Sequence, residues 1–186
     1  MPKPEPGKLY TYSDFYSWDD EERWELIAGV PVHLPKSWPI RHQSALFGFS
    51  KELDFALKEK PCQLIMGPIA VRLNPDGKDD MVVQPDFVIV CNKTKLADGI
   101  ACKGVPDLIG EVLSSPMERH DLLTKFKVYK EAGVREYWIV SPKLRIVTAC
   151  ALSDGKYVCN VYGDGNIPVS IFPGCEINVN EALRQS

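Results

Sequence analysis

Pro106-Asp107-Leu108-Ile109-Gly110-Glu111-Val112-Leu113-Ser114 has the composition of a buried β-strand with one carboxylate inside it. Burying an unpaired ion costs roughly several kcal/mol even after relaxation, so this acid requires a compensating partner. Alternate residues of an extended segment share a face, which places Glu111 with Ile109 and Leu113. Gly110 and Val112 then face the other way. The stretch therefore predicts a core strand that carries a functional acid.

A second carboxylate begins another apolar segment, Val82-Val83-Gln84-Pro85-Asp86-Phe87-Val88-Ile89-Val90. If the two strands are neighbours, Asp86 and Glu111 can converge on one cation, and the carbonyl of Val112 can add a third oxygen. Mg²⁺ suits such a site because it takes few protein carboxylates and keeps several waters. We therefore expect a Mg²⁺ site, with Mn²⁺ as a substitute.

The rest of the chain alternates helical and strand patterns. The spacing of apolar residues predicts a long amphipathic helix from Ile40 to Lys60 and a second helix from Arg119 to Ala132 that ends at Gly133. A short helix is expected to run from a cap at Tyr12-Ser13-Asp14 to about Glu21. The remaining expectations are strands over 24–32 with a bend at Gly29, over 62–73, 81–91 and 135–140, a polar loop over 92–103, a hairpin of 145–151 with 156–162, and a last strand near Ile177. This order predicts an α/β or α+β fold, with a mixed central β-sheet flanked by helices.

Length and composition indicate one globular domain, residues 1–186. The chain has 186 residues, 45% of them hydrophobic, and a formal net charge of −3, which neither indicates nor excludes a nucleic-acid partner. It starts without an apolar signal region and has no run of about 18 apolar residues, so we expect a soluble, cytoplasmic protein with no membrane contact. The six scattered cysteines are expected to be free thiols in the core.

Four motifs occur in an order that resembles the Uma-two family of restriction-type endonucleases, within the PD-(D/E)XK nuclease superfamily. They are Gln84-Pro85-Asp86, Glu111-Val112-Leu113-Ser114, Asp121-x-x-x-Lys125-x-x-x-Tyr129, and Ala132-Gly133-Val134-Arg135-Glu136-Tyr137-Trp138-Ile139-Val140. The similarity covers roughly residues 10 to 162. It implies a restriction-endonuclease-like core, a four-stranded mixed sheet with a helix on either side. It also implies metal-dependent hydrolysis of DNA phosphodiester bonds.

The sequence departs from the superfamily pattern at the catalytic lysine. The usual strand lysine lies two residues after the Glu, and that position is Leu113 here. Lys125 is a replacement from the neighbouring helix, one turn from Leu122 and Tyr129, and could orient the attacking water or stabilise charge on the phosphate. The alternative for Lys125 is an exposed i, i+4 ion pair with Asp121, contributing about 0.3–0.5 kcal/mol.

Other candidate site residues each have a structural alternative. The resemblance makes Glu25 a further acid near the metal, although an edge-strand acid facing solvent explains it equally well. His42 could contact a phosphate or position water, or it could be a helix-surface histidine. Tyr129 is expected in the core, with its hydroxyl steadying Lys125. Asp86 could instead cap local backbone amides.

Three functions follow from these residues. The leading hypothesis is a Mg²⁺-dependent endonuclease acting on DNA. A catalytically silent nuclease-fold binding or regulatory module is the alternative, because Leu113 replaces the lysine and the chain is acidic. A phosphoesterase acting on a small nucleotide is a third. A homodimer formed through the C-terminal hairpin is expected, since cutting two strands generally needs two active sites.

Overall fold

The centre of the molecule is a six-stranded mixed sheet with strand order β11-β10-β9-β8-β6-β3. The computed structural model describes residues 3–114 and 118–186, with the side chains of 118–121 left out. Strands β8 and β9 are parallel, and the other neighbours in this sheet are antiparallel. The strands are β3 (Gln63–Met66), β6 (Phe87–Val90), β8 (Leu108–Val112), β9 (Glu136–Ser141), β10 (Ile146–Ser153) and β11 (Lys156–Tyr162).

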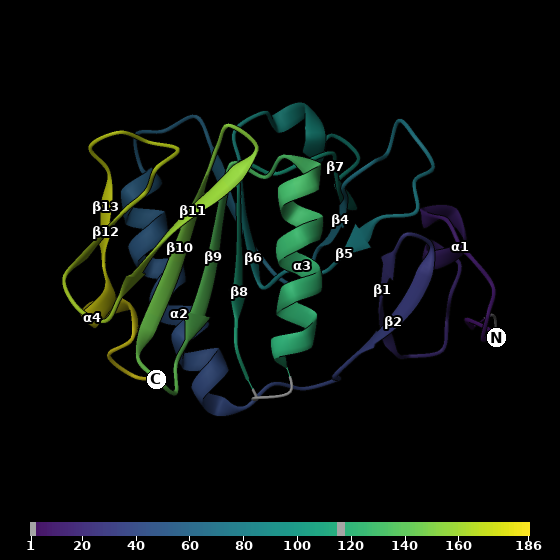
Figure 1. Cartoon of the computed structure of the whole chain (residues 1–186), viewed down its shortest axis with the longest axis horizontal. Helices are drawn as coiled ribbons and strands as arrows, with labels where there is room; N and C mark the ends of the chain where they lie inside the picture. Colours follow the sequence, from purple (N-terminus) through teal and green to yellow (C-terminus); the bar gives the residue numbers. More distant parts are fainter. Residues whose placement is uncertain (1–2, 115–117) are drawn as a thin grey trace.

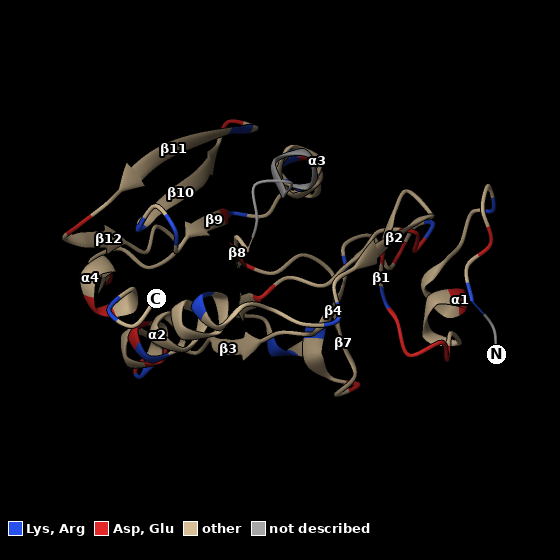
Figure 2. Ribbon diagram, turned by 90° about the horizontal axis from the view of Figure 1, so that it is seen from below, with Lys and Arg blue, Asp and Glu red and all other residues tan. Residues whose placement is uncertain are grey.

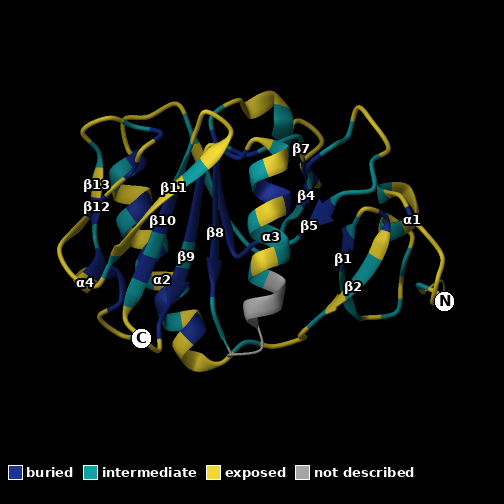
Figure 3. Ribbon diagram, in the orientation of Figure 1, coloured by how far each residue is buried: buried dark blue, intermediate teal, exposed yellow. Residues whose placement is uncertain are grey.

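Two helices cover opposite faces of this sheet, α2 (Ile40–Leu57) and α3 (Glu118–Ala132) (Figure 2). The alternation along β8 divides its side chains between them. Leu108 and Val112 pack into the α2-side core, whereas Ile109 packs into the α3-side core. Because both faces are covered, β8 and β9 are buried along most of their length (Figure 3).

A second, five-stranded sheet lies beside the α3 face, with strand order β2-β1-β5-β4-β7. Its strands are β1 (Arg23–Ile27), β2 (Val30–Leu34), β4 (Ala70–Arg72), β5 (Val82–Val83) and β7 (Ala101–Lys103). It lies with α1 (Tyr12–Tyr16) at the N-terminal end of the molecule (Figure 1). Val71 and Val83 from this sheet share a core with Tyr129 of α3, so the small sheet packs against the central one.

The C-terminal segment closes the opposite end of the molecule (Figure 1). It contains β12 (Asn166–Pro168), β13 (Glu176–Asn178) and α4 (Val179–Ala182). Gly48 of α2 has no Cβ because the backbone of Ala182 occupies that space. The buried carboxylate of Glu136 accepts hydrogen bonds from Trp138 Nε1 at 2.7 Å and from the backbone N–H of Ile171 at 2.9 Å. The tail is therefore part of the main core.

The predicted fold class is confirmed: this is a mixed α and β protein whose central sheet has a helix on each face. The expected strands over 62–73 and 81–91 are each divided, however, and their halves belong to different sheets. The divisions fall at Pro68 and Pro85, since a proline has no N–H to donate to a ladder. The polar loop over 92–103 also contains β7 and a short 3₁₀ helix, η1 (Lys93–Leu96).

The N-terminal helix is shorter than expected and ends at Tyr16. Glu21 has φ +58°, in the left-handed region, so a helix could not continue through it. Of the described helices, none is long and apolar enough to cross a membrane.

The expectation of six free thiols is wrong. Cys62 is bonded to Cys91 and Cys150 to Cys159, while Cys102 and Cys175 are free. Cys150 and Cys159 are directly opposite each other on β10 and β11, and Cys62 and Cys91 continue the β3–β6 register. Cross-strand pairing alone brings these sulfurs together, and spacing along the chain did not indicate it.

Candidate active site

The register between β6 and β8 places the two predicted acids opposite each other. The strands are antiparallel with Phe87 opposite Gly110, so Asp86 continues the pairing opposite Glu111. A Cβ at position 110 would overlap the ring of Phe87, so glycine is required where this ring crosses β8. Asp86 and Glu111 therefore lie at the same end of two adjacent core strands.

Glu111 is buried, with 8% of its surface exposed, and faces α3. Its Oε1 accepts a hydrogen bond from Tyr129 Oη at 2.7 Å and lies 2.9 Å from Lys125 Nζ. Burial is the main reason that the pKa of Glu111 is raised to about 7, with Lys125 opposing the shift and the nearby Asp86 and Glu25 adding to it. The site thus holds more negative charge than one lysine compensates.

Glu25 belongs to the same cluster. It lies on β1, between β2 and β5, and only 2% of its surface is exposed, so the alternative of a solvent-facing edge acid is wrong. Its Oε1 lies 2.9 Å from Lys125 Nζ and accepts a hydrogen bond from the backbone N–H of Gln84 at 2.7 Å. Lys125 therefore joins carboxylates from two different sheets.

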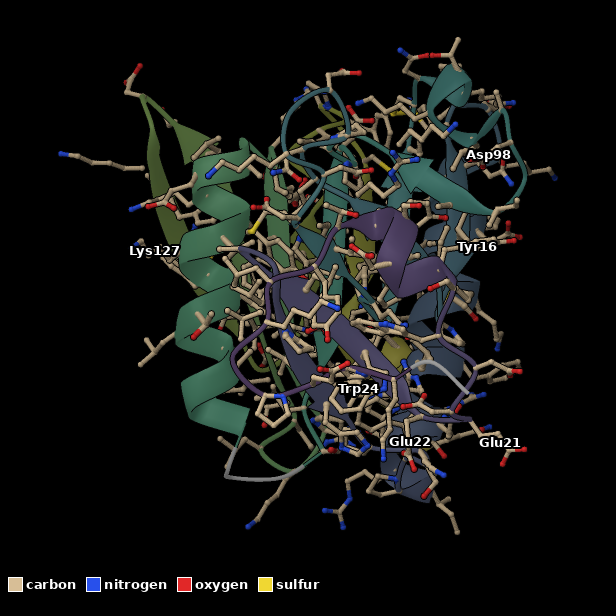
Figure 4. The ribbon with its side chains drawn as sticks, turned by 90° about the vertical axis from the view of Figure 1, so that its right-hand side faces the viewer. Tyr16, Glu21, Glu22, Trp24, Asp98 and Lys127 are labelled. Atoms are coloured by element: carbon tan, nitrogen blue, oxygen red, sulfur yellow. A yellow bond between two sulfur atoms is a disulfide. The ribbon has the colours of Figure 1, made fainter. Side chains whose placement is uncertain are left out.

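Lys125 points inward from α3, with 13% of its side chain exposed. The carboxylates of Glu111 and Glu25 raise its pKa against the opposing effect of burial, so the ammonium stays charged. The alternative of an exposed helix-face lysine is wrong, and the side chain of Asp121 lies outside the described residues. Lys127 lies at the surface on the outer side of α3 (Figure 4), with 72% of its side chain exposed.

Asp86 is held from two sides and is 8% exposed. Its Oδ2 accepts the backbone N–H of Val112 at 2.7 Å, and its Oδ1 lies 3.2 Å from Nε2 of His42. The amide and carbonyl of one residue in an extended strand face the same neighbour, so the carbonyl of Val112 lies on the Asp86 side of β8. The backbone amide that donates to Asp86 belongs to the neighbouring strand, whereas the structural alternative expected a local one, and Asp86 also lies next to the other acids.

His42 is buried in the first turn of α2, with 1% of its surface exposed, so it is not a helix-surface histidine. Its ring is stacked on that of Trp38, with centroids 4.7 Å apart and an interplanar angle of 12°. Neither ring nitrogen has a hydrogen-bond partner among the described residues.

Tyr129 is fully buried, as expected, but its hydroxyl donates to Glu111 and not to Lys125. Sequence reasoning also gave no role to Gln84 and Trp38. Gln84 links the small sheet to the site through its backbone N–H and through its side chain, which donates to the carbonyl of Trp24 at 3.2 Å. Its place before Pro85-Asp86 was visible, but its contacts cross about 60 residues of sequence.

The donor set fits a hard divalent cation. Glu111 and Glu25 face one lysine, Asp86 lies close to Glu111, and Mg²⁺ favours carboxylate and carbonyl oxygens. Within the described residues, no three His, Cys, Asp or Glu side chains are arranged to hold a metal ion by themselves. Asp86 and Glu111 are two carboxylates, and Mg²⁺ is usually bound through one or two carboxylates while it retains several waters.

Comparison with known proteins gives one family, and four solved chains match this structure. No curated protein matches the chain. A solved structure described as "a putative nuclease belonging to DUF820 from Anabaena variabilis" aligns with a TM-score of 0.74 and 16% identity, covering 94% of this chain and 98% of the other. At that identity the likeness concerns the fold alone. The model of a family described as "Uma2: Putative restriction endonuclease" matches residues 12–180. The chain therefore belongs to the Uma2 family.

Proposed function

We propose that this protein is a Mg²⁺-dependent endonuclease that hydrolyses DNA phosphodiester bonds. The observation that carries the proposal is the position of Lys125, whose Nζ lies 2.9 Å from Glu111 Oε1. A lysine from α3 thereby reaches the acid that the superfamily pattern pairs with a strand lysine. In this proposal Asp86, Glu111 and the carbonyl of Val112 hold the ion.

A bound Mg²⁺ would supply positive charge to polarise a phosphoryl oxygen and would lower the pKa of its water. The protein residues supply orientation and a second positive charge. Lys125 is the group that we assign to the charge developing on the phosphate, because it stays protonated and lies next to Glu111. Glu25 fixes the ammonium from the other side, and Tyr129 fixes the carboxylate of Glu111.

The DNA substrate is proposed from the family to which the chain belongs. Fixed carboxylates and a fixed ammonium stabilise a transition state best when they need no reorganisation during the reaction. Asp86, Glu111 and Lys125 are each held by at least one contact of 2.9 Å or less. The charged groups are therefore already in position to stabilise the transition state of phosphodiester hydrolysis.

A plasmid-nicking assay tests the proposal. Supercoiled plasmid is incubated with wild type, Asp86→Asn and Glu111→Gln in Mg²⁺ or Mn²⁺, and nicking should be lost in both variants. Glu136→Gln is the matched control, because Glu136 is also a buried carboxylate but its bonds are to Trp138 and the tail. Nicking that persists in both site variants would rule out this function.

A catalytically silent metal-binding module is a second candidate, favoured by Leu113 at the usual lysine position. Calorimetric titration with Mn²⁺ separates the two candidates. Mn²⁺ binding together with cleavage supports the nuclease, whereas Mn²⁺ binding without cleavage of any nucleic acid supports the silent module.

A further inference from the structure

Asp86 differs from the other two acids of the site in its partner. Lys125 lies 2.9 Å from both Glu25 and Glu111, and no Lys or Arg of the described chain forms an ion pair with Asp86. Among the described side chains, the basic group that lies against Asp86 is the imidazole of His42, 3.2 Å away across the interface between α2 and the sheet. The site therefore has two separate supports, one on each face of the central sheet.

His42 is held in place but not hydrogen-bonded. Its ring is covered by that of Trp38, which lies in the connection between β2 and α2. The guanidinium of Arg23 lies 5.4 Å from the centroid of the Trp38 ring. Arg23 is fixed in turn by the side-chain oxygen of Gln84, at 3.1 and 3.3 Å. Such a stack fixes the plane of the imidazole while leaving its nitrogens unused.

A buried imidazole without hydrogen bonds is unfavourable, because its polar atoms have lost water and gained no partner. The distance from Nε2 to Asp86 Oδ1 is already 3.2 Å, within the range of an N–H···O bond. What the contact lacks is alignment, since neither nitrogen of His42 has a hydrogen-bond partner among the described residues. A small reorientation of the two groups that aligns Nε2–H with Oδ1 would complete the bond.

We infer that His42 is a positioning residue for Asp86. Its Nε2–H donates to Oδ1 while the N–H of Val112 holds Oδ2, so that the carboxylate presents its remaining lone pairs to the ion. Hydrogen bonds to metal-binding carboxylates orient them, and their loss typically costs about 10–100-fold in metal affinity. This inference rests on the proposed function, because it assumes that Asp86 binds the cation.

Three substitutions at position 42 test the inference through Mn²⁺ binding alone, measured by calorimetry without DNA. In His42→Gln the amide nitrogen can take the place of Nε2, whereas in His42→Asn it takes the place of Nδ1, and His42→Leu has no donor. We expect Asn and Leu to weaken Mn²⁺ binding about 10–100-fold and Gln to stay close to wild type. His33→Asn is the control, since 52% of the His33 side chain is exposed.

Thermal unfolding of the metal-free variants separates positioning from packing. Gln and Asn should unfold at similar temperatures while differing in Mn²⁺ affinity, and this comparison does not depend on whether the Leu variant folds. Equal Mn²⁺ affinity of the Gln and Asn variants, whether weakened or unchanged, would overturn the positioning role and leave the nuclease proposal standing. A wild-type protein that binds no Mn²⁺ would overturn both.

Discussion

The charge of this site is set by three carboxylates and one ammonium group. The ammonium of Lys125 contacts Glu25 and Glu111, and Asp86 adds a further negative charge close to Glu111. A charge pair of this kind is costly to break, because removal of one partner leaves the other buried and uncompensated. The predictions at this scale concern Lys125 and Glu111.

We predict that Lys125→Met lowers the free energy of unfolding by about 3 kcal/mol and abolishes plasmid nicking. The loss of stability follows from the two carboxylates that the substitution leaves without a cation. Urea denaturation measures the stability, and a nicking assay measures the activity. Lys127→Met, at an exposed position on the same helix, should change stability by less than about 0.5 kcal/mol. Equal effects of the two substitutions would contradict the buried pair.

The raised pKa of Glu111 predicts how stability depends on pH. The pKa of this carboxyl is about 7 in the folded protein against an ordinary value of 4.5, so the folded chain binds the proton more tightly. The contribution of Glu111 is therefore fully present below pH 4.5 and is lost as the pH rises through about 7. The metal-free wild type should lose on the order of 1–3 kcal/mol relative to Glu111→Gln across this window. Urea denaturation in a chelating buffer measures the difference, and a pH-independent difference would contradict the prediction.

Among the elements, the antiparallel pair β6–β8 decides the geometry of the site. Its register sets Asp86 opposite Glu111, and the close crossing of Phe87 over Gly110 fixes that register. A shift of one residue would move every side chain of β8 to the other face of the sheet, taking Glu111 away from α3. Position 110 is therefore sensitive to any added side chain.

Gly110→Ala is predicted to destabilise the protein by about 1–3 kcal/mol or more, because the new methyl group overlaps the Phe87 ring. Phe87→Leu combined with Gly110→Ala should recover part of the loss, since the smaller side chain vacates the space. Chemical denaturation of the single and double variants measures the coupling. Gly77→Ala is the control, because the nearest atom to its added Cβ lies 3.6 Å away. Strictly additive effects of the two substitutions would contradict direct contact.

At the scale of the whole molecule, one edge of the central sheet is open. β11 is the edge strand, and Val158 and Val161 on it are 58% and 64% exposed. Strand edges with apolar residues and few charges favour pairing with another chain. This surface supports the homodimer expected from the sequence, which would bring two sites to a double-stranded substrate.

We predict that light scattering at high protein concentration gives the mass of a dimer. Val161→Lys should shift it to a monomer, because a charge on the edge opposes strand pairing. Leu144→Lys is the control, as Leu144 is 66% exposed but lies outside the strands, between β9 and β10. A monomer for the wild type at all concentrations would contradict a dimer formed through this edge.

The sequence by itself determined most elements of the centre and singled out Asp86, Glu111 and Lys125 as candidate site residues. Apolar runs around Asp86 and Glu111 and the helical stripe of 119–132 are local patterns, and burial of a carboxylate in such a run is a local argument. The long helix, the β10–β11 hairpin and the mixed sheet follow from the same kind of signal. The functional roles of Asp86, Glu111 and Lys125 stay predictions.

Only the tertiary structure decided which segments meet. It divided two expected strands at Pro68 and Pro85 between separate sheets, and it paired four cysteines that sequence reasoning took as free. It also showed that Glu25 and His42 are buried, although from the sequence alone a surface position explained Glu25 equally well and was the more usual one for a histidine such as His42. The physical reason is that register, sheet membership and burial arise from contacts between residues far apart in the chain, whereas periodicity and propensity report only on near neighbours.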